Sequence, residues 1–272
     1  MAPLRLDRVK AFVLDVDGTL VHRSGEAVHV QPGAAELLAR IRSSGRRLAI
    51  FTNGSHEPPA WFAQGLRAAG LEIANEEMLT PLRSVQVYLR MRRIEEPVLA
   101  FATETAREFM LAEGMRLAGD DGGGAVGAVF VAHADTVDFE LLERAARAVI
   151  AGARLLTASY APAYAGADGP ILSRGAMTAA AIAKASSRRP VIVGKPSRAA
   201  LRTVEEHLRT PASEIAVIGD DVTMDVRLGR MGGARTILVA SGITGHPDLA
   251  DIPPTHRPDA VVGGVAELLD LL

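Results

Sequence analysis

The chain has 272 residues, enough for one large domain or for a core with a second, smaller domain. Apolar residues make up 48% of it, which allows a buried core and argues against disorder. The net charge of −2 argues against a nucleic-acid footprint, and the absence of cysteine excludes disulfides, thiolate catalysis and zinc–thiolate sites. The segment Met1–Asp7 lacks the apolar region of a signal peptide, and no uncharged run approaches the roughly 20 residues of a membrane span. We therefore expect a cytoplasmic protein with no membrane partner.

The beginning of the chain alternates between short apolar runs and helical patterns. Residues 10–14 and 48–51 are apolar runs of the kind that form buried parallel strands. Helical patterns fill 32–45 and 61–70, and Trp61 lies on the apolar face of the second helix, where we expect it in the core. This strand–helix–strand–helix order predicts a parallel sheet covered by helices.

The rest of the chain repeats this alternation in two blocks. In the middle block, 82–188, the expected strands are 97–101, 126–131 and 153–157, the expected helices are 103–114, 138–151 and 175–186, and 158–172 is irregular. In the last block, the expected strands are 191–193, 215–218, 236–239 and 260–262, with helices at 198–208, 222–230 and the C-terminus. The fold class is therefore α/β. The middle block is either more of one sheet or a second domain.

Two aspartates follow directly on the first expected strand. Ligands bind outside the carboxyl ends of strands in an open parallel sheet, so Asp15 and Asp17 face a site. Two carboxylates at i and i+2 repel one another when they are close, and a cation beside them relieves this repulsion. Oxygen-only ligation suits magnesium. Gly18 permits a sharp departure from the strand. The alternative is a surface turn with solvated aspartates.

The second strand ends in Thr52, Asn53 and Gly54, at the start of an expected helix. These residues offer a hydroxyl, an amide and backbone donors. Free N–H groups and the helix dipole hold anions at such a terminus. Taken alone, the segment could equally be ordinary turn chemistry.

Two further strand ends carry charged residues. Lys195 follows one strand, and a cluster of Asp220, Asp221 and Asp225 follows another. Alone, the lysine could be solvated and the aspartates could cap a helix. Four strand ends that carry an acidic pair, a hydroxyl with an amide, a lysine and an acidic cluster together predict an anion-binding pocket that requires a cation.

In this order, the motifs resemble those of the haloacid dehalogenase-like (HAD) hydrolase superfamily over nearly the full chain. The matching segments are Asp15-x-Asp17-Gly18-Thr19, Thr52-Asn53, Lys195 and Gly219-Asp220-Asp221-x-x-x-Asp225. The second motif follows the first after 37 residues, whereas 143 residues separate the second from the third. A long insert at that place resembles the type IIA group. The resemblance implies a Rossmann-like core at 1–81 and 189–272 and an inserted, mobile α/β cap of the C2 type at 82–188.

The resemblance also implies a role for each core residue. Asp15 would attack phosphorus and form an aspartyl phosphate, and Asp17 would protonate the leaving alcohol and then deprotonate the hydrolytic water. Magnesium would be held by Asp15, the Asp17 backbone carbonyl and Asp220, with Asp225 or Asp221 acting directly or through water. The expected phosphate-binding residues are Gly18, Thr52, Asn53 through its backbone, Gly54 and Lys195.

Within the cap, Tyr160 and Arg174 are the residues expected to contact the substrate. Arg174 stands near a helix N-terminus, where a guanidinium would favour an anionic substrate group. Its alternative is an ion pair with Asp168 or another surface acid. The cap departs from its relatives, which often carry an Asn-x-Asp-like segment where this chain has Thr157–Ala161. This departure puts the transfer of any one relative's substrate in doubt.

The expected function is a magnesium-dependent phosphomonoesterase for a small phosphorylated metabolite of sugar phosphate, glycerol phosphate, nucleotide or pyridoxal phosphate type. A catalytically silent sensor or scaffold is the alternative, although all matched positions are filled. Asp17 disfavours a dehalogenase, because a halide leaves without a proton, and phosphomutases usually use another cap type. His22 and Arg23 lie in what resembles the family's flap, where they either shield the site or are solvated. Caps of this type often dimerise in relatives, which allows a homodimer through the cap.

Overall fold

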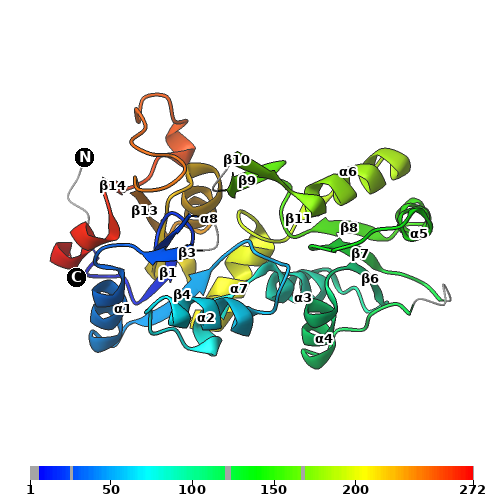
Figure 1. The fold of residues 1–272 in the computed structure, drawn as a ribbon, viewed down its shortest axis with the longest axis horizontal. Coiled ribbons are helices and arrows are strands. Elements are labelled where there is room, and N and C mark those ends of the chain that lie inside the picture. The colour runs from blue at the N-terminus through cyan, green and yellow to red at the C-terminus, as the bar shows by residue number, and fades with distance from the viewer. Residues whose placement is uncertain (1–5, 25–26, 120–123, 167–168, 272) are drawn as a thin grey trace.

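A computed structural model describes residues 6–24, 27–119, 124–166 and 169–271 of the chain. It contains two parallel sheets, and helices cover both faces of each (Figure 1). The predicted α/β fold class is therefore confirmed. Within the described ranges, no helix is long and apolar enough to cross a membrane.

The larger sheet has six strands in the order β14-β13-β12-β1-β4-β5, and all neighbouring strands are parallel. They are β1 (Ala11–Leu14), β4 (Arg47–Phe51), β5 (Met78–Leu79), β12 (Ile215–Gly219), β13 (Arg235–Val239) and β14 (Ala260–Val262). The chain adds β4 and β5 on one side of β1 and returns to add the other strands on its opposite side. Ligands bind beside such a switch point, outside the carboxyl ends of the strands.

Side chains of β1 point alternately to the two faces of this sheet, which explains why its sequence is uninterruptedly apolar. Phe12 and Leu14 belong to the core beneath one pair of helices, and Ala11 and Val13 belong to the core beneath the other pair. The first pair is α1 (Ala34–Ser43) and α2 (Pro59–Ala68), and the second is α7 (Arg198–Leu208) and α8 (Arg227–Gly232). The sheet is therefore buried on both sides and opens only at its edges.

The smaller sheet has four parallel strands in the order β11-β8-β7-β6. They are β6 (Val98–Phe101), β7 (Ala128–Val131), β8 (Arg154–Thr157) and β11 (Val191–Ile192). Helices α3 (Pro81–Arg92) and α4 (Glu104–Ala112) pack on one face, and α5 (Phe139–Ile150) and α6 (Arg174–Ser186) pack on the other. In Figure 1 this sheet and its helices lie to the right of the larger sheet.

Helices α3 and α7 join the two parts of the molecule. They share one apolar cluster, and the Thr203 hydroxyl of α7 donates a hydrogen bond of 3.2 Å to the Ser84 hydroxyl of α3. Strand β11 pairs with β8, so residues 191–192 extend the smaller sheet although we assign them to the core from the sequence. The boundaries of the cap, 82–188, stay a prediction.

The prediction that Trp61 lies in the core is wrong. Its side chain is 47% exposed, whereas Phe62 and Leu66 of the same helix are buried. Side chains of neighbouring helix residues point about 100° apart. Because Phe62 and Leu66 point into the core, Trp61 points toward the edge of the buried face. There the Trp61 ring lies 5.2 Å from the His56 ring, edge to face.

Other segments also differ from expectation. The stretch 158–172 contains an antiparallel hairpin of β9 (Ala163–Gly166) and β10 (Gly169–Leu172), whose glycines and proline weaken the strand signal in the sequence. The helix expected at 222–230 begins as a π-helix, Val222–Val226, before α8. The C-terminal helix, Val265–Leu271, is a 3₁₀-helix. A second hairpin, β2 (Val21–Ser24) with β3 (Ala27–Val30), follows the first aspartate motif.

Candidate active site

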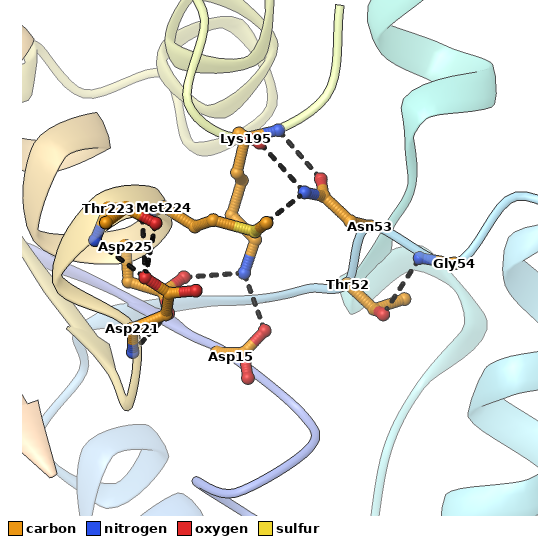
Figure 2. A network of polar contacts seen from close by, with 9 residues as sticks. All are labelled: Asp15, Thr52, Asn53, Gly54, Lys195, Asp221, Thr223, Met224 and Asp225. Atoms are coloured by element: carbon orange, nitrogen blue, oxygen red, sulfur yellow. Dashed lines mark hydrogen bonds and ion pairs between the residues drawn. The ribbon is translucent and has the colours of Figure 1, made fainter. Parts of the chain in front are cut away.

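Four chain segments converge at the carboxyl edge of the larger sheet. Asp15 follows β1, Thr52 follows β4 and Asp220 follows β12, and these three strands are neighbours. Lys195 arrives from the loop after β11 and lies between Asp15 and Asp225 (Figure 2). The structure therefore brings residues from all four sequence motifs together.

Lys195 is the centre of this arrangement. Its Nζ lies 2.6 Å from Oδ1 of Asp15 and 2.6 Å from Oδ1 of Asp225, and its side chain is only 3% exposed. Burial alone would lower the pKa of Lys195, but the charges of Asp15 and Asp225 outweigh burial and raise this pKa. The ammonium therefore stays charged inside the protein.

Three carboxylates face this single ammonium. Ligand oxygens of Asp15, Asp220 and Asp225 all lie within 4.8 Å of one another. Burial raises the pKa of Asp15 well above its ordinary value against the opposing charge of Lys195, and the charges of the other two aspartates add to the rise. Burial is also the main reason that the pKa of Asp220 rises to about 6 and that the pKa of Asp225 is raised.

This cluster fits a divalent metal ion. Its excess negative charge is buried where water screens it poorly, and a cation would favour the ionised carboxylates. All its donors are carboxylate oxygens, which suit a hard cation. Asp15, Asp220 and Asp225 could therefore hold such an ion.

Asp225, rather than Asp221, reaches the cluster. Asp221 lies at the start of the π-helix, where its Oδ1 accepts hydrogen bonds from the backbone N–H groups of Thr223 at 2.6 Å and of Met224 at 3.2 Å. Asp221 is thus a helix cap, and Asp225 points back toward Lys195 at 2.6 Å (Figure 2). The sequence left both aspartates open as the additional metal-site acid.

The loop after β13, which we did not predict as part of the site, holds Asp220 in place. After β13, the Ile243 backbone N–H donates to Oδ2 of Asp220 at 2.7 Å, and the Ser241 hydroxyl donates to the Gly18 carbonyl at 2.9 Å. A Cβ on Gly242 would lie 2.0 Å from Oδ2 of Asp220, so only glycine fits there. The signal was present in the sequence, because Ser241 and Gly242 follow an expected strand of the same sheet.

The residues after β4 have different surroundings from one another. Thr52 is buried, and its Oγ1 accepts a hydrogen bond of 3.1 Å from the Gly54 N–H. A Cβ on Gly54 would lie 2.6 Å from the Phe62 ring, so a larger residue there would have to displace this ring. The Asn53 side chain turns toward Lys195 and bonds its backbone. Thr52 and Gly54 thus bond each other, and Asn53 reaches across to the lysine loop.

Asp17 lies outside the carboxylate cluster. Its side chain is 53% exposed, and its Oδ1 accepts a hydrogen bond of 2.5 Å from Nε of Arg23 in strand β2. Gly18, with φ of +82°, turns the chain directly after it. The hairpin of β2 and β3 therefore contacts the second aspartate of the first motif. Arg23 of this hairpin is thus not merely solvated, because it bonds Asp17.

The two cap residues proposed for substrate contact are exposed and lie apart from the cluster's hydrogen bonds. Tyr160 follows β8, and Arg174 begins α6. Nη1 of Arg174 donates to the Asp135 carbonyl at 3.3 Å and lies 3.8 Å from its carboxylate. Asp168, the acid suggested by the sequence, lies outside the described residues.

The core also contacts the cap beside the site. The Thr103 hydroxyl of the cap donates to the His56 carbonyl at 2.6 Å, and the Thr105 hydroxyl donates to Glu57 at 2.7 Å. The rings of His56 and His133 lie 5.9 Å apart. The loop after the second motif is therefore held against the cap.

Comparisons with known proteins agree with this geometry. Two family models match the chain, haloacid dehalogenase-like hydrolase over 12–116 and HAD-hydrolase-like over 192–268. Ribonucleotide monophosphatase NagD from Escherichia coli K12 is 28% identical over 260 residues, which cover 96% of this chain and 98% of that protein. Chronophin from Mus musculus is 28% identical over 249 residues, covering 88% and 83%.

A solved structure has the same fold. The p-nitrophenyl phosphatase from Archaeoglobus fulgidus superimposes with a TM-score of 0.83 and 26% identity over 97% of this chain and 99% of that one. The chain belongs to the haloacid dehalogenase-like hydrolase superfamily. Within it, the chain is a phosphatase of the type IIA group.

Proposed function

We propose that this phosphatase is a magnesium-dependent phosphomonoesterase that works through an aspartyl phosphate on Asp15. One observation supports this most directly. The Lys195 ammonium lies 2.6 Å from Asp15 and from Asp225, two of the three clustered carboxylates, at the ligand-binding edge of the sheet. Phosphoryl transfer depends mainly on positioning and on neutralising charge, and this arrangement serves both needs.

The chain's own residues account for each step of the reaction. A carboxylate oxygen of Asp15 forms a bond to phosphorus while the bond from phosphorus to the leaving alcohol breaks, and Asp17 donates a proton to that alcohol. Asp17 then takes a proton from water, the water oxygen attacks phosphorus, and the bond to Asp15 breaks to release inorganic phosphate. Lys195 keeps Asp15 oriented and offsets the charge of the phosphoryl oxygens.

Magnesium would be held by the Asp15 carboxylate, the Asp17 backbone carbonyl, Asp220 and Asp225. It would supply positive charge against the incoming phosphoryl group. Gly18, Thr52, Asn53 through its backbone, and Gly54 would bind the phosphoryl oxygens. Gly18 lies against Asp220, Asn53 bonds the Lys195 backbone, and Thr52 and Gly54 belong to the same loop as Asn53.

The substrate is proposed to be a small phosphorylated metabolite that reaches the site beneath a cap formed by 82–188. Tyr160 and Arg174 would meet its leaving-group part. The relatives named above include a ribonucleotide monophosphatase and a p-nitrophenyl phosphatase, which supports phosphate esters as the substrate class. A location in the cytoplasm and a homodimer through the cap stay predictions.

The test is release of inorganic phosphate from a panel of phosphorylated metabolites and p-nitrophenyl phosphate. Wild-type protein should hydrolyse at least one of them with magnesium, poorly with calcium, and not in excess chelator, because calcium prefers more ligands in a looser geometry. Asp15→Asn should abolish turnover and keep the wild-type melting temperature. Asp7→Asn, which changes an exposed aspartate in the turn before β1, is the control and should stay active. A wild-type protein that is folded and inactive on the whole panel would favour the silent sensor or scaffold.

A further inference from the structure

The Asn53 side chain uses both halves of its amide on the backbone of one residue. Its Oδ1 accepts a hydrogen bond of 2.7 Å from the Lys195 N–H, and its Nδ2 donates one of 2.8 Å to the Lys195 carbonyl (Figure 2). Nδ2 also lies 3.3 Å from Sδ of Met224. The side chain therefore faces the lysine loop, and only the backbone of Asn53 is left for a phosphoryl oxygen.

The residues just before Lys195 belong to the other sheet. The Val193 N–H donates to the Thr157 carbonyl at 2.9 Å, and the Gly194 N–H donates to the Ala158 carbonyl at 3.1 Å, which continues the pairing of β11 with β8. Lys195 is the next residue, and its backbone bonds Asn53 beside the larger sheet. The chain thus passes from one sheet to the other between two adjacent residues.

Gly194 marks this crossing. A Cβ at that position would lie 2.3 Å from the Ala158 carbonyl oxygen and 2.6 Å from Oδ1 of Asn53. The Ala158 backbone of the smaller sheet and the Asn53 side-chain amide therefore both pack against Gly194. No side chain fits between them without moving one, so the chain is tightly packed at the residue just before Lys195.

The two ends of Lys195 are then fixed by different groups. Asp15 and Asp225 hold the Nζ end, and Asn53 holds the backbone end. A lysine side chain has a flexible stem, and the ammonium meets both carboxylates only if its Cα stays in place. A free backbone would let the ammonium keep one carboxylate and lose the other.

We propose that Asn53 is a positioning residue that sets the Lys195 ammonium against the nucleophile by clamping the Lys195 backbone where the chain returns from the smaller sheet. This role is separate from phosphate binding by the Asn53 backbone. Its effect on turnover rests on the proposed phosphatase activity, whereas the clamp itself does not.

Asn53→Ala removes both hydrogen bonds and should lower kcat for p-nitrophenyl phosphate about 10- to 100-fold, the usual cost of losing a partner that orients an active-site group. KM should change less than about threefold, because the Asn53 backbone stays in place. Asn75→Ala is the matched control, since Asn75 is exposed and its amide accepts a hydrogen bond from Arg67. Asn53→Ser, which is too short to span the same gap, should reproduce the loss if the alanine variant folds poorly.

Two further measurements distinguish positioning from a general structural role. In a double-mutant cycle, Asn53→Ala should cost little in kcat once Lys195→Ala is present, because both act through the same ammonium. Amide hydrogen exchange by NMR should quicken at Lys195 in Asn53→Ala and stay unchanged at Gly194, whose N–H bonds Ala158. This second measurement needs no activity.

Different results would overturn the clamp, the positioning role and the proposed function. Unchanged exchange at the Lys195 amide would overturn the clamp. Faster exchange with wild-type kcat, or additive losses in the double-mutant cycle, would overturn the positioning role. A wild-type protein without phosphatase activity would defeat the proposed function, while the exchange comparison would still decide whether Asn53 clamps Lys195.

Discussion

Nε of Arg23 and Oδ1 of Asp17 lie 2.5 Å apart, and this contact joins the hairpin of β2 and β3 to the proposed acid. Both side chains are about half exposed, at 45% and 53%, so the pair contributes little to folding. Its consequence is geometric, because it fixes the direction in which the Asp17 carboxylate points.

Replacing Arg23 should therefore affect leaving-group protonation more than substrate binding. Arg23→Ala should lower kcat for alkyl phosphates about three- to tenfold, a small part of the roughly 10²- to 10⁴-fold that a positioned acid contributes. Aryl phosphates should be affected less, because an aryloxide leaves without much proton donation. His22→Ala, at the exposed neighbouring position, is the control. Equal losses on alkyl and aryl phosphates would contradict the prediction.

Gly242→Ala should weaken metal binding. The new Cβ would lie 2.0 Å from Oδ2 of Asp220, so the carboxylate must move away from Asp15 and Asp225. We expect the magnesium concentration for half-maximal activity to rise about 10- to 100-fold, as for other lost supports of metal ligands. The control is Gly65→Ala on the exposed face of α2, where a Cβ meets nothing within 4 Å. That variant should gain about 0.5–1 kcal/mol in free energy of unfolding, as alanine does over glycine in a helix. An unchanged magnesium requirement in Gly242→Ala would count against Asp220 as a ligand.

Acid should destabilise the fold partly through His207. Burial, and then the charge of Arg83, lower the pKa of His207 below its ordinary 6.5. As the pH falls through 6.5, His207 is protonated in the unfolded chain before it is protonated in the folded protein. The stability that is present above pH 6.5 is therefore lost as the pH falls from 6.5 toward the lower pKa that His207 has in the folded protein. His207→Gln should flatten the decline in the free energy of unfolding between about pH 7 and pH 5, measured in urea. His29→Gln, at an exposed position of β3, should leave the decline as it is. A decline of wild-type steepness in His207→Gln would refute this role.

The four strand ends could be predicted because they depend on local patterns. Apolar runs of buried parallel strands are visible in the sequence, and a polar residue directly after each run must lie at the carboxyl edge. This is why Asp15, Thr52 and Asp220 could be placed at one site before their contacts were known. Lys195 follows a strand of the smaller sheet, so its arrival at the same site does not follow from this rule.

What the sequence left open depends on side-chain direction. The conformation of residues 222–226 determines whether Asp221 or Asp225 points toward the site. This segment is a π-helix, and it directs Asp225 toward Lys195. The Asn53 amide finds its partner 142 residues away, which no local period encodes. The wrong placement of Trp61 has the same origin, because an apolar residue at the margin of a helical face can lie on either side of the boundary.

The last prediction concerns Arg174 and the choice of substrate. The core supplies the groups that bind a phosphoryl group, so it distinguishes phosphate esters poorly, and discrimination must come from residues that reach the leaving-group part. Arg174 lies at the start of α6, and its Nη1 donates to the Asp135 carbonyl at 3.3 Å and lies 3.8 Å from the Asp135 carboxylate. Its side chain is 57% exposed, so its guanidinium can still meet an anionic ligand. Arg174→Ala should raise KM for the best metabolite of the panel about tenfold and leave p-nitrophenyl phosphate hydrolysis unchanged.

The control is Arg147→Ala, which removes another exposed cap arginine, paired with Glu143, and should change the hydrolysis of neither substrate. Asp135→Asn decides between the two roles of Arg174: if pairing with Asp135 is its whole role, Asp135→Asn and Arg174→Ala will behave alike on both substrates, whereas a substrate-binding Arg174 loses affinity only when it is itself removed.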